Sequence, residues 1–60
     1  MTYEEQVSKF IKAYQDVFNE RQTRLIYSLA YDRGHAYGFD EVANCFDNLV
    51  DAFILFKEAA

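Results

Sequence analysis

The sequence predicts an all-α fold, in which a helical hairpin associates with further copies into a helical bundle. Three observations support this fold class. The 60 residues contain no proline, apolar residues recur at helical spacing in both halves, and the two glycines lie together in the segment RGHAYG, residues 33–38. We therefore expect a single helical domain over residues 1–60, with a helix at 3–33, a bend at 34–39 and a helix at 40–58.

The first helix is predicted to begin directly after Thr2. Thr2 and Glu5 have the spacing of a capping box, in which a hydroxyl and a carboxylate each accept a hydrogen bond from a backbone amide of the first turn. The apolar positions that follow share one stripe: Val7, Ile11, Tyr14, Phe18, Leu25 and Leu29. Their common phase favours a continuous helix to Arg33.

The polar stretch at 19–24 leaves an alternative open. Asn19 and Gln22 could form a second capping box and begin a new helix there. The chain would then be a three-helix bundle with a break near residue 19, in place of a hairpin.

The last helix is predicted to begin at Asp40, a favourable cap, with Glu41 near the positive end of the helix dipole. Its apolar residues repeat at intervals of four and three, as in a heptad seam: Val42, Phe46, Leu49, Phe53 and Phe56. A second apolar row lies beside them: Ala43, Val50 and Ile54. Together the two rows are wider than one partner helix covers.

The segment between the helices is predicted to be a bend, with Gly34 as the left-handed residue that ends the first helix. Phosphate-binding loops of the glycine-rich type follow a β-strand, and none is expected here. Two alternatives remain. A helix could run through the segment, with the small residues Ala30, Gly34 and Gly38 forming a close helix contact, or the loop could bind a ligand.

Composition excludes several classes of protein. The net charge is -4, and residues 34–60 account for all of it with five acids and one base, so direct nucleic-acid binding is not expected. One cysteine, Cys45, rules out an internal disulfide framework, and with one histidine it cannot complete a His/Cys zinc site within the chain. We expect no metal and no cofactor.

Targeting signals are also missing. The start, MTYEEQ, lacks the basic flank of a signal peptide, and the apolar runs are too short to cross a bilayer. These observations predict a cytoplasmic protein without membrane contact. No serine or cysteine has a histidine at the spacing of an activated nucleophile, so the sequence predicts a non-enzymatic protein.

Arg24, Tyr27 and Tyr31 are the residues that we expect to bind a partner protein. Their spacing places a guanidinium and two rings on one side of the first helix, and these residue types are enriched at binding hot spots. The same patch could instead bind a nucleotide by stacking. A third reading is structural, with the tyrosines packed under a third helix or a second subunit.

Four acidic residues share one side of the last helix: Asp40, Asp47, Asp51 and Glu58. The simplest interpretation is a solvated surface, on which Asp47 and Asp51 steer the encounter with a partner. The alternative is mimicry of a DNA phosphate backbone, by which the protein would inhibit a DNA-binding protein.

A homodimer or larger oligomer is predicted because the first helix would extend beyond the second. The residues expected at the subunit interface are apolar: Val7, Phe10, Ile11, Val50 and Ile54. Arg21 projects into the apolar stripe of the first helix and needs an acidic partner, either Asp51 or an acid from another subunit.

The segment YDRGHAYGFDEV resembles the GH..G..EV segments of short helical accessory proteins encoded by bacteriophages. The matching residues are Gly34, His35, Gly38, Glu41 and Val42. The resemblance implies a protein that binds and modulates a host protein in the host cytoplasm, and it supplies no catalytic or ligand residues. The expected function is thus a small acidic inhibitor or modulator of another protein.

Overall fold

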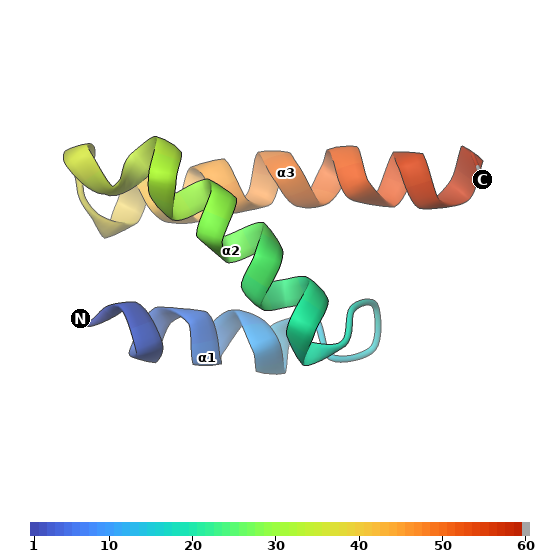
Figure 1. Cartoon of the computed structure of the whole chain (residues 1–60), viewed down its shortest axis with the longest axis horizontal. Helices are drawn as coiled ribbons and strands as arrows, with labels where there is room; N and C mark the ends of the chain where they lie inside the picture. Colours follow the sequence, from blue (N-terminus) through green and yellow to red (C-terminus); the bar gives the residue numbers. More distant parts are fainter. Residues whose placement is uncertain (60) are drawn as a thin grey trace.

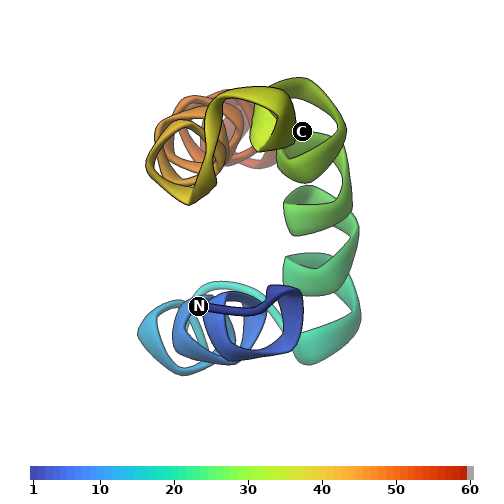
Figure 2. The same ribbon diagram turned by 90° about the vertical axis from the view of Figure 1, so that its left-hand side faces the viewer.

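The computed structural model describes residues 1–59, and this part of the chain is built from α-helices without a β-strand. The helices are α1 (Tyr3–Ala13), α2 (Glu20–Gly34) and α3 (Phe39–Ala59), and a short 3-10 turn at His35–Tyr37 joins α2 to α3. α2 crosses between the other two helices (Figure 1). Viewed from the end, α1 and α3 lie on the same side of α2 (Figure 2). The all-α prediction is confirmed.

The single helix over 3–33 is wrong, and the alternative break near residue 19 is correct. α1 begins with the predicted capping box, in which Glu5 N donates to Thr2 Oγ1 over 3.2 Å. A second capping box begins α2, where Gln22 N donates to Asn19 Oδ1 over 2.8 Å and Asn19 N donates to Gln22 Oε1 over 3.0 Å. These local hydrogen bonds outweigh the continuity of the apolar stripe.

The break restarts the phase of the helix, so the predicted stripe does not continue into α2. The buried side of α2 is formed by Thr23, Ile26, Tyr27, Ala30 and Gly34. Leu25 and Leu29, which were predicted to lie on the core stripe, are 58% and 39% exposed. α1 instead folds back against α2 and buries Val7.

Aromatic side chains fill the space between α1 and α3. Phe46 of α3 is fully buried, and its ring stacks on Phe10 of α1 with 4.1 Å between the centroids. Tyr14 and Tyr27 lie 5.5 and 6.2 Å from the same ring. The core therefore depends on rings from all three helices, each contributing large apolar area.

In the bend, the glycine with a positive φ is Gly38, whereas the prediction gave that role to Gly34. Gly38 has a φ of 104°, whereas Gly34 has a φ of −111° and forms the last residue of α2. α3 begins at Phe39, one residue before the predicted cap Asp40, which lies in the first turn. The prediction of a bend between the helices holds, but Gly34 does not end α2 in the left-handed region.

Gly34 is required for the close contact between α2 and α3. A Cβ atom at this position would lie 2.8 Å from the backbone N of Val42 and 2.9 Å from the backbone C of Glu41. The close contact considered for the small residues is thus present at Gly34, but the helix that was to run through the segment is not, because Gly38 has a φ of 104° and lies between α2 and α3.

We expect Gly34→Ala to lower the free energy of unfolding by about 1–3 kcal/mol, because the added methyl group meets backbone atoms that cannot rotate away. Alanine is the better helix former, so the clash must outweigh that gain. Urea denaturation measures the change. Ser28→Ala, at an exposed position of the same helix, is the control and should be neutral or slightly stabilising. If the free energy of unfolding rose equally in both variants, the close contact at Gly34 would be contradicted.

Thr23 provides a second test of the core. Its side chain is fully buried, and its Oγ1 has no hydrogen-bond partner among the described residues. Thr23→Val should raise the free energy of unfolding by about 1 kcal/mol, because it removes an unsatisfied hydroxyl and preserves the shape. Thr23→Ser keeps the hydroxyl, loses the methyl group and should be less stable than the wild type. A destabilised valine variant would show that the hydroxyl is satisfied.

Candidate interaction surfaces

The predicted Arg24, Tyr27 and Tyr31 surface is covered by the chain itself. Tyr27 is fully buried, and its hydroxyl donates to Oε1 of Gln6 in α1. The ring of Tyr3 meets Tyr27 edge-on, with 4.9 Å between the centroids. The prediction that Tyr27 lies at a partner surface is therefore wrong, and the structural reading, packing under a third helix, is correct.

The other two members of that patch are also engaged within the chain. Arg24 pairs with Glu4 of α1 over 3.3 Å and with Glu20 of α2 over 3.1 Å. Tyr31 is half-buried and stacks on the ring of His35, with centroids 4.8 Å apart and planes at 12°. These contacts occupy the guanidinium and the ring that a stacked nucleotide would need.

Gln6 makes the polar connection between the three helices. Its amide nitrogen donates to the carbonyl oxygen of Phe39 over 3.1 Å, while its amide oxygen accepts from Tyr27. Gln6 is itself buried. Burial raises the pKa of the Tyr27 hydroxyl to about 12, and the nearby hydroxyls of Tyr3 and Tyr31 contribute in the same direction.

The residues predicted for the subunit interface lie in or against the core of the single chain. Val7 and Val50 are buried, so their assignment to an interface between subunits is wrong. Phe10, Ile11 and Ile54 are half-buried and pack against the same core. The predicted extension of one long helix beyond its neighbour does not exist. The break lets α1 fold back, so that its own apolar side chains pack against the core.

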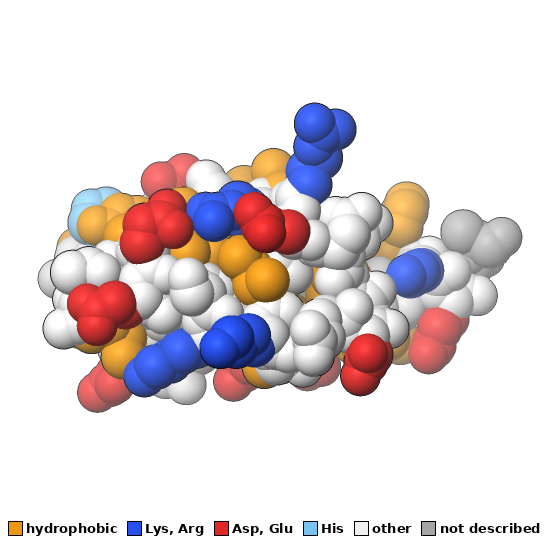
Figure 3. All heavy atoms as spheres, turned by 90° about the horizontal axis from the view of Figure 1, so that it is seen from below, with side chains coloured by type: hydrophobic (Ala, Val, Ile, Leu, Met, Phe, Trp, Pro, Cys, Tyr) orange, Lys and Arg blue, Asp and Glu red, His pale blue; other side chains and the backbone are white. Residues whose placement is uncertain are grey.

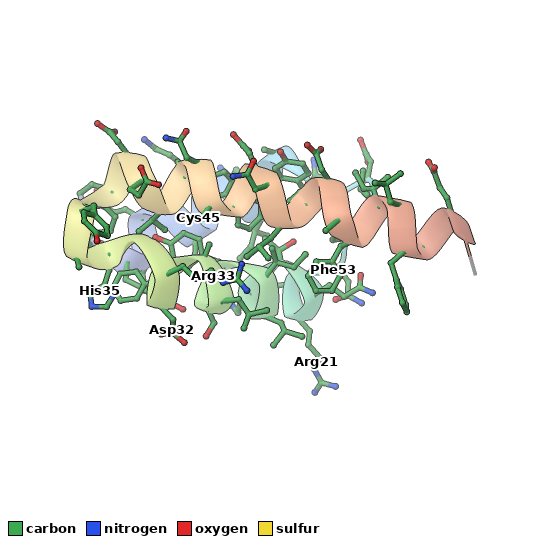
Figure 4. The ribbon with its side chains drawn as sticks, turned by 90° about the horizontal axis from the view of Figure 1, so that it is seen from above. Arg21, Asp32, Arg33, His35, Cys45 and Phe53 are labelled. Atoms are coloured by element: carbon green, nitrogen blue, oxygen red, sulfur yellow. The ribbon has the colours of Figure 1, made fainter. Side chains whose placement is uncertain are left out.

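The acidic row on α3 is exposed, as the solvated interpretation expects: Asp40, Asp47, Asp51 and Glu58. Asp47 accepts a long hydrogen bond from the Tyr14 hydroxyl, at 3.4 Å. Burial, followed by the charge of Asp47, raises the pKa of Tyr14. Arg21 does not pair with Asp51. Its side chain projects from α2 into solvent, on the side away from α3 (Figure 4).

An apolar surface that the sequence did not identify lies at the end of α3. Phe56 is 77% exposed, and together with Ala52 and Phe53 it lines a shallow apolar hollow. We call these three residues the α3-end surface. The heptad pattern placed Phe53 and Phe56 in a seam, but α3 extends past the other helices, which leave its end uncovered (Figure 1). The feature of the sequence that could have indicated this surface is the length of the last helix.

The surroundings of the α3-end surface fix its position. Lys57 Nζ donates to the carbonyl oxygen of Val17 over 3.2 Å and lies 5.9 Å from the centroid of the Phe18 ring. These contacts hold the end of α3 against the turn between α1 and α2.

On the α1 side of the molecule, acidic and basic side chains are intermingled, with apolar side chains between them (Figure 3).

Neither a metal site nor a membrane span is found in the described part of the chain. No group of three or more histidine, cysteine or carboxylate side chains could hold a metal ion there. Cys45 is a half-buried free thiol. Among the same residues, no helix has the length and apolar character that crossing a membrane requires.

Tyr27 makes stability depend on pH in the alkaline range. Its pKa rises from 10.0 to about 12 on folding, so the fold favours the neutral hydroxyl. The resulting stability is complete below pH 10 and is lost as the pH rises toward 12. At about pH 11 the loss is about 1.4 kcal/mol. Denaturation in urea at a series of pH values measures it. In Tyr27→Phe the loss of stability at high pH should be smaller. If the free energy of unfolding fell with pH as steeply in this variant as in the wild type, the loss could not be assigned to Tyr27.

Comparison with known proteins identifies a family and no closer relative. No curated protein and no solved structure matches this chain. The model of DUF8546, a family of unknown function, matches residues 2–54. The match extends from the cap of α1 into the second half of α3 and includes both capping boxes. This chain therefore belongs to the DUF8546 family.

Proposed function

We propose that this chain is a non-enzymatic interaction module that binds another protein through the α3-end surface and modulates it. The observation that carries the proposal is the exposure of Phe56, a large apolar ring with 77% of its area in solvent beside the half-buried Phe53. Apolar surface of this kind, in contact with water, is typical of a site that another molecule covers. Aromatic residues are enriched at the centres of such interfaces.

The surface is held in place well enough to act as a preformed site. Lys57 ties the preceding turn of the chain to α3 through the Val17 carbonyl oxygen. Phe53 lies between α3 and the beginning of α2, so the inner side of the surface rests on the core (Figure 4). A ring that is already positioned loses little conformational entropy when a partner docks.

The charges nearby suit a protein partner that carries basic residues. Asp47 and Asp51 lie on the exposed side of α3 and would steer such a partner toward the helix, raising the association rate. The resemblance of residues 31–42 to phage accessory proteins supports a host protein as the partner and inhibition or modulation as the outcome. The module needs no cofactor for this role.

The partner can be sought by placing a photo-crosslinking amino acid at Phe56 in cells that naturally produce the protein. We expect one dominant adduct with another protein. The matched control is Tyr37, an aromatic side chain that is 80% exposed in the 3-10 turn between α2 and α3. The same adduct at both positions, or adducts only with further copies of this chain, would contradict the proposal.

Affinity for the captured protein then tests the surface. Phe56→Ser should weaken binding by about tenfold or more, because it removes an exposed ring expected to be buried at the interface centre. Tyr37→Ser, a matched loss of an exposed ring, should leave the affinity unchanged. Circular dichroism should show both variants folded, since neither ring belongs to the buried core. Equal affinities for the wild type and Phe56→Ser would refute the α3-end surface as the binding site.

A further inference from the structure

The outer side of α2 carries a short stripe of residues that the described chain leaves partly or fully exposed. It consists of four residues at intervals of four, four and three, which places them on one side of a helix: Arg21, Leu25, Leu29 and Asp32. The two leucines are 58% and 39% exposed. Arg21 and Asp32 both project from α2 away from α3 (Figure 4). We call these four residues the α2 stripe.

The charged side chains at the two ends of the stripe form no ion pair within the described chain. The nearby Arg24 pairs with Glu4 and Glu20, but neither Arg21 nor Asp32 has an ion-pair partner among the described residues. They cannot pair with each other, because 11 residues of helix separate them by roughly 16 Å. Both side chains are exposed to solvent, and each remains available to an opposite charge on another molecule.

We propose that the α2 stripe is the contact surface for a second copy of this chain, with the two α2 helices antiparallel about a two-fold axis. Such an axis places Arg21 against Asp32 of the second copy and repeats the pair at the other end. It also places Leu25 against Leu29 of the second copy. A surface that matches itself in this way is what a two-fold interface requires.

Charge and apolar pattern agree on the same register. The midpoint of Arg21 and Asp32 is position 26.5, and the midpoint of Leu25 and Leu29 is position 27. These positions differ by about 0.8 Å along the helix, so one axis satisfies both pairs. A parallel arrangement in register would instead bring arginine to arginine and aspartate to aspartate, and like charges in contact disfavour it.

A groove beside the stripe has the shape and chemistry to receive the second copy. It opens next to Leu25 and is otherwise lined by Phe18, Gln22, Ile26 and Phe53. The antiparallel register brings Leu29 of the second copy to this end of α2. Leucine is an apolar side chain of suitable size for a mostly apolar groove.

Sedimentation equilibrium over about 1 µM to 1 mM tests the dimer, since small interfaces of this kind bind weakly. The expected species has twice the chain mass of 7.1 kDa. Leu29→Ser should raise the dimer dissociation constant by about 30-fold or more, because each dimer loses two buried leucines. The control is Leu55→Ser, which removes an equally sized side chain, 66% exposed, away from the stripe. It should leave the constant unchanged.

The register is tested by reversing the charges. Arg21→Asp and Asp32→Arg should each raise the dissociation constant by about tenfold or more, because each turns two attractions per dimer into two repulsions. The combined variant should restore the dimer to about its original affinity, which a loss of folding would not do. Helicity measured by circular dichroism should be equal in all variants, since both side chains are exposed.

A chain that stays monomeric over this range would overturn the proposal. So would a dimer that Leu55→Ser weakens as much as Leu29→Ser, or one that the combined charge reversal does not restore. Phe53 lines the groove and also belongs to the α3-end surface, but Phe56, the residue on which the proposed function depends, lies outside both the α2 stripe and the groove, so the dimer does not rest on that function. A failed partner search therefore leaves these measurements unaffected.

Discussion

A single glutamine side chain sets the arrangement of the three helices. Gln6 of α1 accepts a hydrogen bond from Tyr27 of α2 and donates one to the carbonyl oxygen of Phe39 at the beginning of α3. Gln6 and Tyr27 are buried, and an unpaired polar group away from water is costly. Sliding or rotating α1 would therefore leave the Tyr27 hydroxyl without its partner, and the rings that α1 carries into the core depend on that placement.

Local signals in the sequence predicted where the first and last helices begin. The Thr2–Glu5 capping box begins α1, and α3 begins within one residue of the predicted Asp40. The Asn19–Gln22 pair also indicated the correct break, whereas the common phase of the apolar residues indicated a continuous helix. Choosing between them required knowing that Val7 would be buried by α1 folding back. That contact joins distant parts of the chain, and helical periodicity alone does not report it.

The interaction residues were harder to predict, for the same reason. The spacing of Arg24, Tyr27 and Tyr31 correctly places them on one side of α2, but whether that side meets water depends on where α1 docks. Conversely, Leu25 and Leu29 fit a core pattern and lie outside it, because the phase restarts at residue 19. No pattern marks Gln6 as buried. Its role follows from two hydrogen bonds to residues 21 and 33 positions away.

The way in which α1 is attached has a consequence for the native ensemble. Only Gln6 and Val7 of α1 are buried, and rings and one amide group, not closely packed backbones, connect α1 to α3. Elements with few buried contacts undergo local unfolding at a smaller free-energy cost than the rest of a domain. Release of α1 uncovers Tyr27 and Tyr31 together and frees Arg24 from Glu4. An aromatic and cationic surface of Tyr27, Tyr31 and Arg24 thus becomes more exposed in the partly opened form of the same chain.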